Sequence, residues 1–180
     1  MAESHDPEAH HRSCWCMVRA IDHNAIAGAV NIRELGDYLS VWLGSEVHFR
    51  RFNIGLINEA EHMFTDAYVT GQNVAGRATG HRRTLDGTVV EAAIAAGDGI
   101  FVGGDEVKLL RRFPRFGPVL ESGMRAMLAA PLRDEGEVIA SLVLASDDPY
   151  AFDQMALDLV NRAGTAAAAR IAALRVTELK

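Results

Sequence analysis

One segment, from Glu121 to Phe152, constrains the fold more than any other part of the chain. It contains two apolar runs, Met124–Leu132 and Glu137–Ala145, separated by the polar sequence Arg-Asp-Glu-Gly. Two apolar runs joined by a short polar turn with glycine are typical of a β-hairpin. A loop containing Pro149 follows the second run and leads into a long alanine-rich stretch. The segment therefore predicts an antiparallel hairpin followed by a helix.

Apolar spacing and turn residues divide the rest of the chain into helices and strands. In the first half of the chain we expect a helix that ends near Gly44, strands over residues 47–56 and 62–70, and a loop to residue 83. A helix over 88–97, a strand at 99–102 and helical turns over 105–112 should follow. The hairpin and a closing helix over 153–178 complete the order. The apolar alternation changes phase at Arg50-Arg51, which predicts a β-bulge there. Short links between strands favour antiparallel pairing.

These elements predict an α+β fold with a central antiparallel sheet of about five to six strands. We expect the N- and C-terminal helices to cover one face, and short helices and loops to cover the other. A chain of 180 residues is long enough for one domain. We expect residues 1–19 to form a disordered N-terminal tail and residues 20–180 to form a single domain that includes the terminal helices.

The composition excludes several classes of function. A formal net charge of −6 argues against nucleic acid as the main partner, because phosphate contacts require a positive surface. No apolar run approaches the roughly 18 residues that a membrane-spanning helix needs, and the polar N-terminus does not resemble a secretory signal. Both cysteines, Cys14 and Cys16, lie near the N-terminus, so the remainder cannot hold a disulfide framework. We expect a cytoplasmic protein with no nucleic-acid or membrane partner.

Four potential metal ligands lie close together in the N-terminal segment: His10, His11, Cys14 and Cys16. Imidazole and thiolate groups suit zinc or copper. Ligands this closely spaced rarely form a closed tetrahedral site, so we favour a solvated tail and expect no metal site. A redox-sensitive cysteine pair is an alternative, and it would require a lowered thiol pKa.

Three stretches resemble one family in their order and spacing. They are RTLDGTVVEAAIAAGDGIFV at residues 83–102, GMRAMLAAPLRDEGEVIASLVLAS at 123–146 and DPYAFDQMALDLVNRAGTAAAARI at 148–171. The first reads as a capped helix, a glycine-bounded turn and a strand, the second as a hairpin, and the third as a closing helix preceded by an aromatic residue. Together they resemble a GAF domain, a small-molecule- and chromophore-binding relative of PAS domains. The resemblance covers residues 35–174.

The resemblance implies a ligand cavity on one face of the sheet, walled by the central helices and a variable loop. It also implies pairing through the terminal helices, which in this family often relay a signal to an attached output domain. Because the chain ends at Lys180, we expect a stand-alone sensor or an output partner on a separate chain. Small residues permit close helix packing, so we expect a homodimer contact through Ala163, Ala166, Ala167 and Ile171. Packing of these residues on the chain's own sheet is the alternative.

Several ligands of GAF domains do not fit this sequence. Members that bind cyclic nucleotides carry an Asn-Lys pair before the phenylalanine and Asp-Glu after it, whereas this chain has Ser146-Asp147-Asp148 before Phe152. Bilin-binding members attach the chromophore through a cysteine or flank it with Asp-Ile-Pro and His motifs, and this chain has neither. Members that reduce methionine sulfoxide need cysteines in the core. The cofactor therefore stays unknown, with cyclic nucleotides and bilins not expected.

Histidines and acidic pairs are the other groups that could carry chemistry. His48, His62 and His81 lie on or beside expected strands, where a histidine could ligate haem iron. Isolated histidines are far more often surface residues, so we do not expect haem. Asp105-Glu106 and Asp134-Glu135 fall in predicted turns, where acids are normally solvated. We find no catalytic constellation and expect no enzyme.

The candidate ligand residues come from the central strands and the segments that would face them. They are Phe49, Arg51, Tyr68, Thr70, Phe101, Phe113, Phe116, Met124 and Met127. A mostly apolar pocket with a few polar groups is typical of a ligand site. Arg51 could hold a carboxylate or phosphate, with the hydroxyls of Tyr68 and Thr70 fixing the orientation. The alternative is that the apolar members simply form the core. In an acidic chain the arginine pairs 50–51, 82–83 and 111–112 with Arg115 are more often surface or ion-paired groups than a binding patch.

The sequence thus predicts a non-enzymatic, dimeric sensor. We expect it to bind a small molecule over the sheet and to relay binding through the terminal helices. A structural or protein-interaction module with a filled cavity is the first alternative. A redox- or metal-responsive protein that uses Cys14 and Cys16 is the second.

Overall fold

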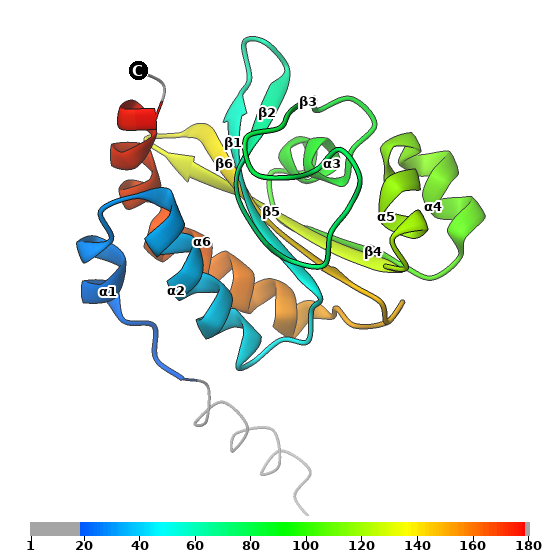
Figure 1. The fold of residues 1–180 in the computed structure, drawn as a ribbon, viewed down its shortest axis with the longest axis horizontal. Helices are drawn as coiled ribbons and strands as arrows, with labels where there is room; N and C mark the ends of the chain where they lie inside the picture. The colour runs from blue at the N-terminus through cyan, green and yellow to red at the C-terminus, as the bar shows by residue number, and fades with distance from the viewer. Residues whose placement is uncertain (1–18, 179–180) are drawn as a thin grey trace, which may run out of the picture.

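A six-stranded antiparallel sheet forms the centre of the computed structural model, which describes residues 19–178 (Figure 1). The strands are β1 (Arg51–Asn58), β2 (Met63–Gly71), β3 (Arg82–Thr84), β4 (Ile100–Gly103), β5 (Ala126–Asp134) and β6 (Glu137–Ser146). Their order across the sheet is β3-β2-β1-β6-β5-β4. This α+β architecture confirms the fold class predicted from the sequence. The tail expected over residues 1–19 lies outside the described residues, apart from its last residue.

Strands β5 and β6 form the predicted hairpin. Asp134 pairs with Glu137, so Glu135 and Gly136 make the turn between them. Both turn residues have positive φ, 49° and 90°, as type I′ hairpin turns require. Because β6 also pairs with β1, this hairpin and the β1–β2 hairpin join at the centre of the sheet.

One face of the sheet is covered by helices α2 (Ile32–Gly44) and α6 (Gln154–Glu178), and α1 (His23–Gly28) packs against these two helices (Figure 1). At the start of α2, the side-chain oxygen of Asn31 accepts a hydrogen bond of 2.8 Å from the backbone N–H of Glu34. The carboxylate of Glu34 in turn accepts one of 3.0 Å from the backbone N–H of Val30. No helix in residues 19–178 is long and apolar enough to cross a membrane.

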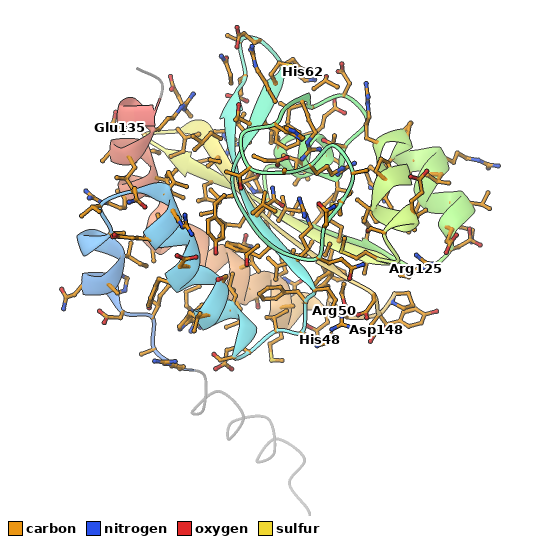
Figure 2. All side chains as sticks on the ribbon, viewed as in Figure 1. His48, Arg50, His62, Arg125, Glu135 and Asp148 are labelled. Atoms are coloured by element: carbon orange, nitrogen blue, oxygen red, sulfur yellow. The ribbon has the colours of Figure 1, made fainter. Side chains whose placement is uncertain are left out.

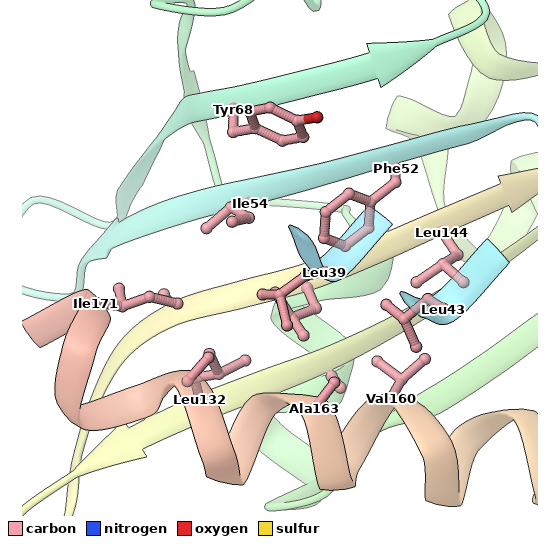
Figure 3. Packing of buried hydrophobic residues seen from close by; sticks show 14 of the residues in the cluster. Leu39, Leu43, Phe52, Ile54, Tyr68, Leu132, Leu144, Val160, Ala163 and Ile171 are labelled. Atoms are coloured by element: carbon pink, nitrogen blue, oxygen red, sulfur yellow. The ribbon is translucent and has the colours of Figure 1, made fainter. Parts of the chain in front are cut away.

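The first hydrophobic core lies between these helices and the sheet. Figure 3 shows Leu39 of α2 next to the sheet side chain Phe52, with Ala163 and Val160 of α6 on the other side of the same core. Ala163, Ala167 and Ile171 are completely buried within this core, and Ala166 is partly buried beside it. The dimer contact expected through these residues is therefore corrected, because burial against the chain's own sheet leaves the first three no surface for a second copy.

The opposite face carries shorter elements: α3 (Val89–Ala96), α4 (Glu106–Arg112), a 3₁₀ turn (Pro114–Phe116) and α5 (Gly117–Glu121) (Figure 1). At the start of α3, the hydroxyl of Thr88 accepts a hydrogen bond of 3.0 Å from the backbone N–H of Glu91. The Glu91 carboxylate accepts one of 2.8 Å from the backbone N–H of Gly87. This capping arrangement was predicted from the sequence. A second hydrophobic core lies between α3–α5 and the sheet.

The bulge lies at a different place from the one predicted. Arg51 is the first residue of β1, so the change of phase at Arg50-Arg51 marks the start of the strand. The extra residue is Ala67 in β2: Ile54 pairs with Tyr68, and the next residue of β1, Gly55, pairs with Asp66. An extra residue turns all later side chains of a strand to the other face. Asp66 therefore faces α3–α5, whereas Tyr68 faces α2.

Candidate functional site

A hollow lies over the sheet on the face covered by α3, α4 and α5. Side chains from β1, β2, β5 and β6 form its floor, and α3 and the segment between α4 and β5 form its walls. Its free volume is about 30 Å³, which is room for about two water-sized spheres. The residues from the sequence-based set that line it are Arg51, Phe113, Phe116, Met124 and Met127. We call this space the inner hollow.

The other four residues of the predicted set lie elsewhere, which corrects that part of the prediction. Phe49 packs against the core beneath α2. Tyr68 faces the same helix because of the bulge, and its hydroxyl donates a hydrogen bond of 2.7 Å to Asp37; Thr70 follows it on the same face. Phe101 is 41% exposed and lines a separate depression beside β4, because its strand neighbours take the inward positions.

Four arginines converge on the inner hollow from separate parts of the chain. Arg51 comes from β1, Arg77 from the loop after β2, Arg83 from β3 and Arg115 from the 3₁₀ turn. The side chain of Arg51 is buried, with only 6% of the residue exposed. This burial corrects the interpretation of the Arg50-Arg51 pair as surface or ion-paired groups, whereas Arg83 is ion-paired, as that interpretation allows. Consecutive side chains of a strand point to opposite faces, so an Arg-Arg pair in a strand sends one guanidinium inward.

A single buried carboxylate, that of Asp66, lies among these arginines and is 0% exposed. Arg83 donates two hydrogen bonds to it, of 3.0 Å from Nε and 2.9 Å from Nη2. Asn53 of β1 donates a third, also of 3.0 Å. The guanidinium of Arg83 lies 4.2 Å from the ring centre of Phe64. Asp66 is therefore saturated by Arg83 and an amide, as a buried charge requires.

The side chains of Arg51 and Arg77 contact backbone carbonyl groups instead of a carboxylate. Arg51 donates to the backbone carbonyls of Gln72, at 2.7 Å, and of Arg77. Arg77 donates to the backbone carbonyl of Arg115. Neither arginine takes part in any ion pair among residues 19–178. The cluster of Arg51, Arg77 and Arg83 around the single carboxylate therefore carries excess positive charge.

The positive charge of the cluster is costly to the protein. Burial, together with repulsion from Arg83 and the other neighbouring guanidinium groups, lowers the pKa of Arg77 to about 10, and Asp66 offsets only part of this shift. Burial also lowers the pKa of Arg51. In both cases the charged form loses hydration that backbone carbonyls replace only in part.

A second, more open space adjoins the inner hollow; we call it the outer hollow. It has a volume of about 470 Å³ and shares Arg77, Arg83, Thr88 and Arg115 with the inner hollow. Arg82 adds a further cation to its rim. The arginines therefore stand between a nearly filled inner space and an open approach from solvent. This arrangement can receive a small molecule from solution and hold its charged group inside.

The comparisons with known proteins agree with this geometry. The family model for the GAF domain matches residues 24–171. The chain belongs to the GAF domain family. This confirms the resemblance inferred from the sequence. A comparison with curated proteins found no match.

Solved structures with the same fold include three of interest for function. The GAF domain of a two-component sensor histidine kinase from Bacillus halodurans has a TM-score of 0.67 at 12% identity, covering 83% of this chain and 99% of that one. The GAF domain from an Acinetobacter phosphoenolpyruvate-protein phosphotransferase has a TM-score of 0.69 at 15% identity, covering 87% and 92%. Free methionine-R-sulfoxide reductase from Neisseria meningitidis has a TM-score of 0.64 at 16% identity, covering 97% and 96%.

These likenesses show the fold. GAF domains of sensor kinases and phosphotransferases are signalling or regulatory domains, and one of the three structures is an enzyme. The cysteines of the present GAF domain are Cys14 and Cys16, and both lie outside the described residues together with His10 and His11.

Among residues 19–178, one group of side chains could hold a metal ion. His62, Asp86 and Glu91 each offer a ligand atom, and these atoms lie within 4.8 Å of one another. The imidazole Nε2 of His62 is 3.0 Å from Asp86 and 3.2 Å from Glu91, so a protonated histidine would pair with both carboxylates instead. Figure 2 shows His62 near one end of the sheet and His48 near the other. His48, His62 and His81 are all exposed, and none lines the inner hollow.

Three residues of the cluster were missed by the sequence analysis. Asn53 and Asp66 alternate with apolar residues in β1 and β2, and a polar residue on the inward side of a strand is a usable signal. Arg77 lies in a loop rich in glycine, and no local pattern marks it as inward-facing. Only the path of the loop across the sheet brings it to Arg51.

Proposed function

We propose that this GAF domain is a non-enzymatic regulatory domain that binds a small molecule at the inner hollow. The observation that carries the proposal is the set of polar side chains enclosed between the sheet and the α3–α5 segments, open to solvent through the outer hollow. A structural core would fill this space with apolar side chains. The regulatory role of GAF domains in sensor kinases and phosphotransferases supports the same proposal.

The sheet offers a physical route from this site to the terminal helices. Along β1, Arg51 and Asn53 face the inner hollow, while Phe52 and Ile54 belong to the core beneath α2 and α6. A ligand that shifts β1 therefore changes the packing of both helices. We propose that α2 and α6 transmit the effect of ligand binding. The outward faces of these helices would form a homodimer, and a separate protein would receive the signal.

Native mass spectrometry of the full chain as purified tests binding and subunit number together. We expect a dimer that retains a small molecule, and we expect hydrogen exchange in α2 and α6 to change when that molecule is removed and restored. A monomer without any bound molecule, together with unchanged exchange on saturation with a bound compound, would contradict the sensor role.

A structural or interaction module is the second candidate, and the small inner hollow is the observation that favours it. A free volume of about 30 Å³ admits only about two water molecules unless the surrounding segments move. Ala145 on the floor of the inner hollow provides the test. If the space is structural, Ala145→Val fills it and raises the melting temperature without loss of function, whereas in a sensor the same change weakens ligand binding.

A further inference from the structure

We propose that the ligand of this site carries a compact oxyanion, a carboxylate or phosphate group, that is held by Arg51 and Arg77. The inference rests on the proposed function and names the class of ligand. It follows from the charge balance of the cluster, from the way the two guanidinium groups are held, and from the shape of the two hollows.

The charge balance is the first argument. A buried ion is stable when an opposite charge and hydrogen bonds replace its lost water. Arg83 and Asp66 satisfy each other through two hydrogen bonds. Within residues 19–178, the hydrogen-bond partners of the Arg51 and Arg77 side chains are all carbonyl oxygens, and burial lowers the pKa of both arginines. An anion from solution would balance the positive charge that Asp66 leaves in excess.

The second argument is that the two guanidinium groups are fixed before any ligand arrives. Carbonyl groups of Gln72 and Arg77 hold Arg51, and the carbonyl of Arg115 holds Arg77. A guanidinium has more N–H groups than these contacts use, in a planar fork that fits carboxylate and phosphate. Because Arg51 donates to the backbone of Arg77, the two groups are linked in one arrangement. A preorganised pair loses little entropy on binding.

The third argument concerns size and approach. The inner hollow, about 30 Å³, has no room for a tetrapyrrole or a nucleobase. The outer hollow, about 470 Å³, is lined by Arg77, Arg82, Arg83 and Arg115, so it attracts anions although the whole chain has a net charge of −6. The oxyanion would sit at the arginines, with any remaining part of the molecule in the outer hollow.

The test is a titration of the full chain in chloride buffer of constant ionic strength with inorganic phosphate, with succinate and with acetate, followed by calorimetry and melting temperature. We expect phosphate or a carboxylate to bind and to raise the melting temperature by several degrees. Comparing the affinity for phosphate with the affinities for succinate and acetate shows whether the site prefers a phosphate or a carboxylate group. Arg51→Gln and Arg77→Gln should each weaken binding by about tenfold or more.

Arg111→Gln is the matched control, because it removes an equal charge from an exposed position on α4. Arg77→Lys keeps the charge without the planar fork, and should bind more weakly than the unchanged protein but more tightly than Arg77→Gln. Circular dichroism confirms that each variant folds; should Arg51→Gln not fold, the Arg77 variants carry the test.

Two results would overturn the inference: no oxyanion binds, or Arg111→Gln weakens binding as much as Arg77→Gln does. Its failure can be told apart from failure of the proposed function. A neutral molecule that binds at the inner hollow and is insensitive to Arg77→Gln would refute the anion class and leave the sensor role standing. An oxyanion that binds through Arg51 and Arg77 without changing exchange in α2 and α6 would support the ligand class and refute the relay.

Discussion

Arg83 holds the buried carboxylate of Asp66 with two hydrogen bonds, 3.0 Å from Nε and 2.9 Å from Nη2. Arg83 thereby uses the hydrogen-bonding capacity of the carboxylate at the centre of the arginine cluster. Arg51 and Arg77 therefore form no ion pair with an acidic side chain among the described residues. The free energy of unfolding and the affinity for anions therefore both depend on Asp66. A substitution of Asp66 should lower the first and raise the second.

We predict that Asp66→Asn lowers the free energy of unfolding by about 3–5 kcal/mol, because it leaves Arg83 buried without its partner. The same change should tighten phosphate binding, since the freed Arg83 adds to the local positive charge. Urea unfolding with and without phosphate measures both effects. The double variant Asp66→Asn with Arg83→Gln serves as the control and should be more stable than the sum of its single changes indicates. Weaker phosphate binding by Asp66→Asn would show that the carboxylate itself positions the ligand.

Gly36 of α2 lies directly against the ring of Tyr68, and this contact allows α2 to approach β2 closely. A Cβ at this position would lie 2.4–2.6 Å from three ring atoms. We predict that Gly36→Ala lowers the free energy of unfolding by about 1–3 kcal/mol, although alanine favours a helix by about 1 kcal/mol over glycine. Thermal or urea unfolding measures the change.

Gly28→Ala is the matched control for this prediction. A Cβ at Gly28 would meet nothing within 4 Å, so the substitution should be neutral or stabilise by up to about 1 kcal/mol. Equal effects at the two glycines would mean that α2 does not pack on Tyr68 as described.

The parts of the fold that could be predicted from the sequence are those with local signals. The turn at Glu135-Gly136 and the cap at Thr88 each place a recognisable residue pair at a fixed spacing. The bulge at Ala67 has no such signal, because the apolar alternation of β2 reads equally well without it. The prediction that placed Tyr68 on the ligand face was therefore wrong, because the extra residue Ala67 turns the Tyr68 side chain to the opposite face of the sheet.

The candidate site shows the same limit. Phe116 and Met124 were predicted to line the cavity because they belong to the central strands and the segments that would face them, and both line the inner hollow. The arginine cluster depends on pairings between β1, β2 and β3 and on the loop that carries Arg77, which are distant in sequence. Arg51 was predicted as a ligand residue that could hold a carboxylate or phosphate, and it lines the inner hollow. Its lack of an acidic partner could be seen only in three dimensions.

Thr88 connects the start of α3 to the wall of the inner hollow. Its hydroxyl accepts a hydrogen bond from the backbone N–H of Glu91 and donates one of 2.6 Å to the carbonyl of Leu85. We predict that Thr88→Ala lowers the free energy of unfolding by about 1 kcal/mol and speeds hydrogen exchange in α3. Thr165→Ala, at an exposed position of α6, is the control. Unchanged exchange in α3 would indicate that the cap does not hold this wall.

The hydroxyl of Tyr68 is expected to make stability depend on pH in the alkaline range. The side chain is 7% exposed, and burial, together with the nearby Asp37 carboxylate, raises the pKa of the Tyr68 hydroxyl. Below the ordinary tyrosine pKa of about 10, the hydroxyl is protonated in both the folded and the unfolded chain. As the pH rises above this value, the unfolded chain loses the proton first. Ionisation then favours the unfolded state, so the contribution of Tyr68 to stability falls.

We therefore predict that Tyr68→Phe costs about 1 kcal/mol near pH 7, where the hydrogen bond to Asp37 is lost, and that this cost shrinks above pH 10. Urea unfolding of both proteins at a series of pH values measures it. Tyr150→Phe, which removes a hydroxyl from a residue that is 83% exposed, provides the background. A cost that stays constant from pH 7 to about pH 11 would contradict the raised pKa. It would mean that the Tyr68 hydroxyl ionises as readily in the folded protein as in the unfolded chain, and that the contact between α2 and β2 admits water.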